Sequence, residues 1–427
     1  MKVVVVGGGI IGLTSAYELV KEGCEVTVID SAKVGAAASH GNAAKIALGE
    51  SGPVPAPGVL LQGLRWMLKP DSPLYVTPSL APSYLRFMFS MARHCNLSDY
   101  NAGLELNLRM AEDACDLLDG YKADGLDYEM HERGVLLAFE TEERLKEHCV
   151  QLRIYERFGH HGQILRGDEV LEAEPALSDR IKFGVKYSND RQLDPDSLTR
   201  ALADAITARG GTILEDTAVD DLIHRNGRVT AVVLDTGEAL NTDQVVLAAG
   251  VAVRDLTRKL GQEVPIHSGK GYSLDYAPAP VKLRTSLTLE DARVAVTPLD
   301  GFVRLAGTME FGARSLKVNP ARVEAIRRAA HENLRDWDVN EPGERTPWAG
   351  LRPMTADGMP TVGRLASQEN AWVAGGHGML GLTLGPFTGK LIADLIAGRT
   401  PRLSAQEMAV LDPNRFSRAG RRLSTAV

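Results

Sequence analysis

Cysteine, long apolar runs and surplus basic charge are all scarce in this chain of 427 residues. Its four cysteines, at positions 24, 95, 115 and 149, form no CxxC or similar pair, so we expect neither a zinc site nor a disulfide framework. Free thiols indicate a reducing compartment. No apolar run reaches the roughly 18 residues that a membrane-spanning helix needs. Because 55 acidic residues outnumber 48 basic ones, charge gives no reason to expect a nucleic-acid partner.

The rest of the composition is that of a globular protein. Hydrophobic residues make up 44% of the chain and charged residues 24%. The length allows about two or three domain-sized units around a large core. A strand pattern that begins at Lys2 leaves no room for a secretory signal, so we expect the chain to stay in the cytoplasm.

The first thirty residues carry a dinucleotide-binding pattern. The β-branched run Lys2–Val6 predicts a buried parallel strand, and Gly7–Gly12 satisfies GxGxxG. A helical pattern follows to about Glu22, and a second strand over Glu25–Ile29 ends at Asp30. The N-terminus of such a helix offers unpaired N–H groups to phosphates. An acid at position 30 favours an unphosphorylated ribose, hence FAD or NAD rather than NADP.

Each glycine of this loop has a distinct physical role. Gly7 permits the tight turn, Gly9 lets the backbone approach a pyrophosphate, and Gly12 lets the helix pack on the strand. A glycine-rich turn that binds nothing is the alternative, but the strand, helix, second strand and acid in the right order favour a nucleotide.

Two later segments bear on the choice between FAD and NAD. Gln244–Gly250 predicts a buried strand that ends in small residues, and Trp372–Thr383 predicts a strand that breaks into a glycine-rich turn before a helix. The N–H groups of that turn suit the negative charge that gathers at the flavin N1/O2 edge on reduction. The alternative is another tight turn. A second Rossmann half, expected for a nicotinamide cofactor alone, is not evident.

Local patterns also predict elements between these segments. Asp194 followed by Pro195 is typical of a helix start, and that helix should run to about Arg209. Alternating residues over Arg293–Thr297 and Phe302–Leu305 predict strands of an antiparallel sheet.

The chain resembles the D-amino-acid oxidase superfamily of FAD enzymes in five collinear segments, which are Gly7–Asp30, Ser39–Ala43, Ala249–Gly250, Trp348–Met354 and Gly376–Gly381. The stretch from Ser39 through Gly58 to Met67, and Gly269–Ser273, are similar to the bacterial D-amino acid dehydrogenase small subunit. The resemblance covers nearly the whole chain, to about Pro413.

This resemblance implies an α/β fold with two domains. A Rossmann-like, GR2-type FAD-binding domain should be discontinuous and comprise residues 1–50, 194–255 and 346–427. An inserted α+β substrate domain that carries an antiparallel sheet should comprise residues 51–193 and 256–345.

The resemblance also implies the contacts of a non-covalently bound FAD. They are Gly7, Gly9, Ile10, Ile11, Gly12, Asp30, Ser31, Ser39, Asn42, Ala43, Val219, Ala249, Gly250, Gly378, Met379, Leu380, Gly381, Leu382 and Thr383. Val219 should touch the adenine through its backbone. Sarcosine-type relatives attach FAD through a cysteine near the C-terminal turn, whereas the last cysteine here is Cys149.

For the substrate, the family implies Arg352, Tyr272 and His377 as catalytic residues. Arg352 should bind the substrate carboxylate bidentately, and Tyr272 should donate a hydrogen bond to the same group. His377 should lie beside the flavin. The alternatives are a surface arginine, a core tyrosine and a packed histidine. The roles of His40 and Lys45 stay open, although Lys45 could approach flavin N5. We expect no bound metal.

The implied reaction is the FAD-dependent oxidative deamination of D-amino acids to 2-oxo acids. The α-hydrogen would pass as hydride to flavin N5, and the electrons would go to a quinone or another carrier. One alternative is the oxidation of cyclic imino acids such as cis-4-hydroxy-D-proline or D-proline. Others are a non-catalytic flavoprotein and an NAD-dependent dehydrogenase.

Two apolar segments, Val59–Met67 and Tyr84–Met91, leave a question of location open. They could touch lipid on the cytoplasmic face of the inner membrane, or form buried or subunit-facing helices. The residues specify neither the oligomeric state nor the choice between oxygen and quinone.

Overall fold

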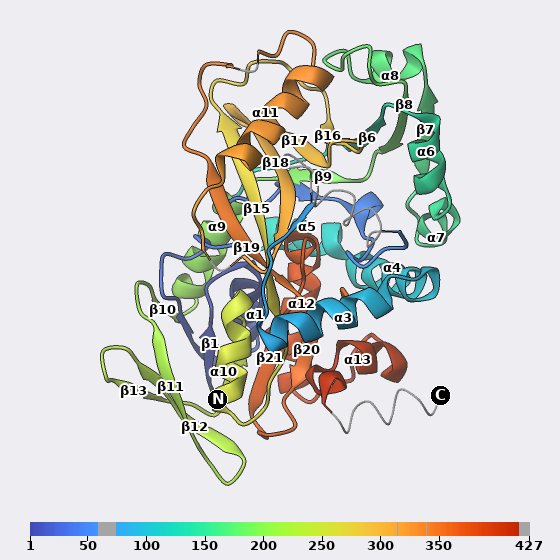
Figure 1. Cartoon of the computed structure of the whole chain (residues 1–427). Helices are drawn as coiled ribbons and strands as arrows, with labels where there is room; N and C mark the ends of the chain where they lie inside the picture. Colours follow the sequence, from blue (N-terminus) through green and yellow to red (C-terminus); the bar gives the residue numbers. More distant parts are fainter. Residues whose placement is uncertain (59–73, 314, 339, 418–427) are drawn as a thin grey trace.

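Two large sheets organise the chain, whose computed structural model describes residues 1–58, 74–313, 315–338 and 340–417 (Figure 1). The first sheet has the order β10-β2-β1-β14-β21-β20, and neighbouring strands are parallel except for β20 and β21. Its strands are β1 (Lys2–Val6), β2 (Glu25–Ile29), β10 (Thr212–Leu214), β14 (Gln244–Leu247), β20 (Thr361–Arg364) and β21 (Ala371–Gly375). This is the Rossmann-like sheet that the sequence predicts.

The valines of β1 alternate between the two covered faces of this sheet. Val3 and Val5 pack against the helices of one face, and Val4 and Val6 pack into the core on the other. The first face carries α1 (Ile10–Lys21), α9 (Pro195–Ala208) and α12 (Gly381–Ile396). The second carries α10 (Val253–Lys259) and a small sheet of β11 (Val219–Arg225), β12 (Arg228–Leu234) and β13 (Ala239–Asn241). Burial on both faces explains why β1 is almost wholly apolar.

The second large sheet follows the order β19-β15-β18-β17-β16-β6-β8-β7, with β4 beside β18. Its pairs are antiparallel except β16 with β6 and β18 with β4. Its strands are β4 (Leu74–Val76), β6 (Val135–Phe139), β7 (Gly162–Arg166), β8 (Phe183–Tyr187), β15 (His267–Tyr276), β16 (Ser286–Leu289), β17 (Val294–Leu299), β18 (Phe302–Phe311) and β19 (Trp348–Met354). The helix α11 (Pro320–Asn333) packs on one face of this sheet, leaving the other face for the cavity described below (Figure 1).

The remaining elements lie outside the two large sheets. They are β3 (Lys45–Ile46), β5 (Met130–His131), β9 (Arg191–Leu193), α3 (Pro82–His94), α4 (Leu97–Ala111), α5 (Ala114–Ala123), α6 (Glu142–Cys149), α7 (Leu152–Arg157), α8 (Asp168–Ala173), α13 (Ala405–Leu411) and the 3-10 turns η1 (Leu48–Glu50), η2 (Gly250–Ala252) and η3 (Pro413–Phe416). β3, β9 and β5 form a small sheet of their own.

The helix start expected at Asp194 is present. The carboxylate of Asp194 accepts hydrogen bonds from the backbone N–H groups of Asp196 and Ser197, each at 3.2 Å, and Pro195 is the first residue of α9. Packing does not follow the expected domain boundaries in one place, because α4 and α5 lie against α12 and share the core of the Rossmann-like sheet. The boundaries themselves stay a prediction.

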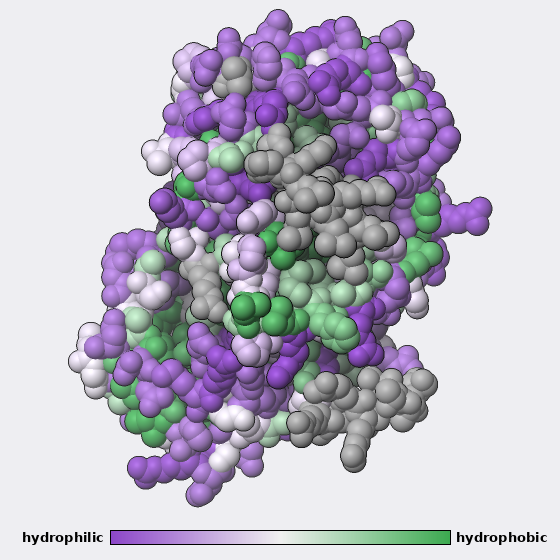
Figure 2. All heavy atoms as spheres, viewed as in Figure 1, coloured by the Kyte–Doolittle hydropathy of each residue, from purple (hydrophilic) through white to green (hydrophobic). Residues whose placement is uncertain are grey.

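Of the two segments proposed to touch lipid, Val59–Met67 lies outside the described residues. In Tyr84–Met91, which is part of α3, the side chains of Tyr84, Phe87 and Met91 are buried, while Leu85 and Phe89 are 49% and 68% exposed. Figure 2 shows apolar side chains gathered over α3 on this face of the molecule. Within the described ranges, no helix combines the length and the apolar character that crossing a bilayer requires.

Candidate active site

A cavity of about 1410 Å³ lies where the carboxyl ends of β1, β2 and β14 meet the second sheet. The Rossmann-like side contributes the loops after these strands and the first residues of α1 and α12. The other side is formed largely by residues of β15, β16, β18 and β19. The volume is large enough for a dinucleotide together with a small substrate.

The loop after β1 is shaped by two glycines that no other residue could replace without movement. Gly7 has a φ of +113°, and a Cβ atom there would lie 2.5 Å from the Ala248 carbonyl oxygen. A Cβ atom on Gly12 would lie 1.8 Å from the Gly7 carbonyl oxygen. Gly12 does not line the cavity, so it contributes by letting α1 pack on the loop, as the sequence predicts.

The N-termini of α1 and α12 both open into this cavity. The N-cap residues that precede these helices, Gly9 and Leu380, make no side-chain cap hydrogen bond, and neither helix has an acidic residue in its first turn. The Ile10 N–H donates to Ser39 Oγ at 2.9 Å. Uncapped helix N-termini carry unpaired donors and a partial positive charge, which suit a pyrophosphate and an electron-rich ring edge.

Asp30 both braces the loop and faces the cavity. Its Oδ2 accepts from the Gly8 N–H at 2.7 Å, and its Oδ1 accepts from the Ala32 N–H at 2.9 Å. Each carboxylate oxygen keeps one lone pair for a ribose hydroxyl. The bracing contact with Gly8 adds a role that sequence analysis did not assign to this residue.

All the expected cofactor contacts except Gly12 line this cavity. They are Gly7, Gly9, Ile10, Ile11, Asp30, Ser31, Ser39, Asn42, Ala43, Val219, Ala249, Gly250, Gly378, Met379, Leu380, Gly381, Leu382 and Thr383. The residues present therefore fit FAD, since the cavity is large enough, two helix N-termini without a side-chain cap open into it, and the carboxylate of Asp30 faces it.

Arg352 points into the cavity from β19. Its Nη1 donates to the Thr308 carbonyl oxygen at 3.1 Å, and no carboxylate of the described residues lies within ion-pair distance of it. Burial lowers the pKa of the Arg352 guanidinium to about 10, so the side chain remains charged at neutral pH. Apart from Asp30 and Arg352, all Asp, Glu, Lys and Arg side chains that line the described cavity belong to ion pairs. An unpaired cation in such a space is a site for an anion.

Glycines clear the space around Arg352 and its neighbour Trp348. A Cβ atom on Gly271 would lie 2.0 Å from Arg352 Nη1. Cβ atoms on Gly41 and Gly350 would lie 2.1 and 1.9 Å from atoms of the Trp348 ring. These three glycines therefore fix where the guanidinium and the indole lie.

Tyr272 does not reach the cavity, which corrects the expectation that it binds the substrate carboxylate. Side chains alternate along β15, so Gly271 faces Arg352 while Tyr272 faces the opposite side of the sheet. Tyr272 is 1% exposed and packs in the core between the sheet and α11, with Leu274 and Ile326. It is the core tyrosine that we gave as its alternative.

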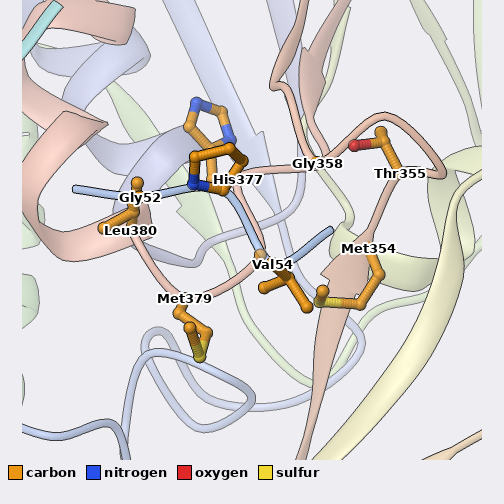
Figure 3. A pocket seen from close by; sticks show the side chains of 11 residues that line it. Gly52, Val54, Met354, Thr355, Gly358, His377, Met379 and Leu380 are labelled. Carbon is orange, nitrogen blue, oxygen red and sulfur yellow. The ribbon is translucent and has the colours of Figure 1, made fainter. Parts of the chain in front are cut away.

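His377 lies at the edge of the cavity, in the turn after β21. Its Nε2 is 2.9 Å from Thr388 Oγ1, and its Nδ1 has no hydrogen-bond partner among the described residues. Burial lowers the pKa of His377 to about 3, so the ring is neutral at physiological pH. Figure 3 shows the side chains around it, where a small hollow of about 10 Å³ lies beside Met354 and Val54.

His40 and Lys45, to which the sequence assigns no definite role, lie in different places. His40 does not line the cavity, and its Nδ1 is 2.8 Å from both carboxylate oxygens of Asp196, which raises the pKa of His40. Lys45 lines the cavity, is almost fully buried, and pairs with Glu50. Its Nζ also donates to Thr288 Oγ1 at 2.6 Å.

The sequence did not point to Gly271, Glu50 and Thr288 as residues that line the cavity. Gly271 belongs to the Gly269–Ser273 segment, but nothing in that segment indicates a role for this glycine. Glu50 and Thr288 belong to no recognisable pattern, and they meet only because the fold brings residues 238 positions apart to one place.

Comparisons with known proteins identify the family. The model of the family described as FAD dependent oxidoreductase (DAO) matches residues 2–395. A D-amino acid dehydrogenase of Methylobacterium sp. (strain 4-46) is 33% identical over 419 residues, 96% of this chain and 98% of that protein. One of Cereibacter sphaeroides is 32% identical over 437 residues, 100% of this chain and 98% of that protein.

Solved structures show the same fold. Glycine oxidase from Geobacillus kaustophilus superposes with a TM-score of 0.76 at 23% identity, covering 97% of this chain and 98% of that one. L-proline dehydrogenase from P. horikoshii superposes with a TM-score of 0.74 at 21% identity, covering 98% of each chain. The chain therefore belongs to the DAO family of FAD-dependent oxidoreductases, as its sequence motifs predict.

Proposed function

We propose that this chain is an FAD-dependent D-amino acid dehydrogenase, which oxidises the Cα–N bond of its substrate and releases a 2-oxo acid. The observation that carries the proposal is the unpaired guanidinium of Arg352 in the cavity that the FAD cradle opens into. Relatives that match nearly the whole chain are named D-amino acid dehydrogenase, which supports a D-amino acid as the substrate.

Arg352 binds the substrate carboxylate through two parallel N–H···O bonds, which fix orientation as well as position. With one Nη1 proton held by the Thr308 carbonyl, the guanidinium is itself held in place before the substrate arrives. FAD, when bound, supplies the acceptor for the α-hydrogen and its electron pair. The contribution of the protein is then mainly orientation and electrostatics.

His377 contributes as a neutral group. Its unpartnered Nδ1 is buried at the turn that begins α12, where the cofactor contacts are expected. A neutral imidazole adds no positive charge to the cavity that Arg352 also lines, so the carboxylate has one charged partner. We assign His377 a contact with the cofactor or the substrate, and no Asp or Glu is required as a base, because a deprotonated amine can expel the α-hydrogen unaided.

The cofactor is proposed to be non-covalent. None of the four cysteines is among the described residues that line the cavity, so no thiol is placed to attach a flavin. The released imine hydrolyses in water to the 2-oxo acid and ammonia. The electrons leave to a quinone or another carrier.

An anaerobic substrate panel tests this function. The purified holoenzyme is mixed with D-alanine, D-phenylalanine, D-proline, cis-4-hydroxy-D-proline and the corresponding L-amino acids. We expect D-amino acids to bleach the flavin absorbance and L-amino acids to leave it unchanged. Bleaching by the cyclic compounds alone would replace the proposal with an imino-acid dehydrogenase, and a chain that binds FAD but is bleached by none of them would contradict it.

A further inference from the structure

The floor of the cavity is a row of small residues that ends at a hydroxyl. On adjacent strands, Ala306 pairs with Ala295, and Ala295 pairs with Thr288, so all three lie on one face of the sheet. All three line the cavity, as does Gly271 under the guanidinium of Arg352. Small side chains between Arg352 and Thr288 leave room for a substrate side chain to lie across the sheet.

Three residues close a hydrogen-bonded ring at the far end of this row, and we call them the distal network: Lys45, Glu50 and Thr288. Lys45 Nζ contacts Glu50 Oε2 and donates to Thr288 Oγ1 at 2.6 Å, and Thr288 Oγ1 donates to Glu50 Oε1 at 2.9 Å. The side chains of Lys45 and Glu50 are 5% and 24% exposed. One Nζ proton and a lone pair on each Glu50 oxygen remain for a ligand.

The charges at this end of the cavity cancel. Besides Lys45 with Glu50, Arg293 pairs with Glu290 at 2.6 Å and Arg144 pairs with Glu147 at 2.8 Å. His148, whose Nε2 is 2.9 Å from Tyr187 Oη, has its pKa lowered to about 4 by burial and is neutral. A charged substrate group would therefore find no counter-charge there, whereas an uncharged hydrogen-bonding group would leave every pair intact.

The spacing of the strands sets how long a substrate must be to contact both Arg352 and the distal network. β15 and β16 are three strand intervals apart, which is about 14 Å. Gly271 also lies two residues along β15 from Ser273, the partner of Ala306, so the two ends are offset by about 7 Å along the strands and lie about 16 Å apart. A hydrogen bond of about 2.9 Å at each end leaves about 10 Å between the carboxylate and the distal group. A tyrosine-like side chain comes close to this length, and an alanine-like one falls far short of it.

We propose that the distal network binds an uncharged hydroxyl at the end of a long substrate side chain, and so makes a hydroxylated D-amino acid of tyrosine length the preferred substrate class. This inference rests on the proposed function, because it takes the carboxylate to be held by Arg352. Glu50 accepts the hydroxyl proton and Lys45 donates to the hydroxyl oxygen, while the apolar floor excludes water from the rest of the side chain.

Matched substrates test the inference. D-tyrosine and D-phenylalanine differ by the hydroxyl alone, and D-lysine carries a charge at a similar reach. We expect the holoenzyme to show a kcat/KM for D-tyrosine at least about tenfold above that for D-phenylalanine, as one hydrogen bond to a charged group allows. D-lysine should be turned over less well than D-tyrosine. Equal values for D-tyrosine and D-phenylalanine, or a preference for D-lysine, would overturn the inference.

Two variants separate the network from general damage. Thr288→Val and Glu50→Gln should bring the D-tyrosine to D-phenylalanine ratio close to one while D-phenylalanine turnover persists. Thr285→Val, whose hydroxyl bonds Gly134 outside the cavity, and Glu25→Gln, on a 67% exposed side chain that pairs with Lys2 outside the cavity, serve as matched controls and should keep the wild-type ratio. An unchanged ratio in Thr288→Val and Glu50→Gln contradicts the assignment.

A binding measurement gives a readout that does not depend on turnover. Isothermal titration with 4-hydroxyphenylpyruvate and phenylpyruvate, the corresponding 2-oxo acids, should show tighter binding of the hydroxylated compound in the wild type and loss of that difference in Thr288→Val. If D-amino acids bleach the flavin but no hydroxyl preference appears, this inference alone fails. If none bleaches it, the proposed function fails as well.

Discussion

At the scale of single residues, the candidate site depends on glycines that make room for larger groups. Gly271 lies under the Arg352 guanidinium, and the alternation of β15 turns the next residue, Tyr272, into the core. A one-residue difference in register would exchange these two positions. The site therefore depends on strand register as much as on the identity of Arg352.

Gly271→Ala tests this dependence. The added Cβ would lie 2.0 Å from Arg352 Nη1, so the guanidinium must move away from the strand. We expect KM for a D-amino acid to rise by about tenfold or more while the FAD content stays unchanged, because a displaced guanidinium loses charge-assisted bonds. Steady-state kinetics and the flavin spectrum measure both. Gly120→Ala, where an added Cβ meets nothing within 4 Å, is the control and should leave KM unchanged.

His377 makes stability depend on pH. Its pKa is lowered by burial to about 3, from about 6.5 in an unfolded chain. Because the depressed pKa belongs to the folded state, the stabilisation is complete above about pH 6.5 and is lost as pH falls toward 3. At pH 5 the loss is about 2 kcal/mol.

Urea unfolding of the wild type and His377→Gln at pH 7 and pH 5 measures this effect. The wild type should lose about 2 kcal/mol more than the variant over this interval. Identical losses in the two proteins would show that His377 is not held neutral.

At the scale of elements, the contact between β1, its loop and α1 is the best-predicted part of the chain. The sequence predicts this contact because the strand, the glycine loop, the helix and Asp30 follow one another within thirty residues. The cap of α9 by Asp194 was predictable for the same reason. Contacts of this kind are local and leave a signal in the sequence.

The distal network and the position of Tyr272 could not be predicted in this way. Thr288 lies in β16 and Glu50 in the turn η1, and the two residues are 238 positions apart in the sequence. The face taken by Tyr272 depends on the pairing of β15 with β18, which has an irregularity between Lys270 and Tyr272. Neither long-range contact nor register at such an irregularity is encoded by a local pattern.

Gly12→Ala tests the strand–helix contact. Its Cβ would lie 1.8 Å from the Gly7 carbonyl oxygen, and this neighbour is backbone, so α1 must shift away from the loop. We expect a loss of stability of about 1–3 kcal/mol together with a loss of bound FAD. Thermal unfolding and the ratio of flavin to protein absorbance measure these changes, and an alanine variant with full FAD would contradict the packing role.

At the scale of the whole molecule, the cavity separates the two large sheets, and the cofactor that fills it should hold them together. A ligand that binds only the folded state stabilises it by about 2.7 kcal/mol at 100 times its dissociation constant. We therefore expect removal of FAD by dialysis to lower the melting temperature by several degrees, and added FAD to restore it. Equal melting temperatures for the apo and FAD-loaded protein would show that FAD does not fill this cavity.

The central claim is that Arg352 holds the substrate carboxylate within reach of the flavin, and anaerobic stopped-flow reduction tests it most directly. The rate of flavin bleaching is measured against D-amino acid concentration for the wild type, Arg352→Ala, and Arg335→Ala, which replaces an exposed arginine paired with Asp179. We predict that Arg352→Ala retains FAD but needs roughly 10- to 150-fold more substrate for half-maximal bleaching, as the loss of hydrogen bonds to a charged group implies, while Arg335→Ala matches the wild type. A wild-type concentration dependence in Arg352→Ala would contradict the account.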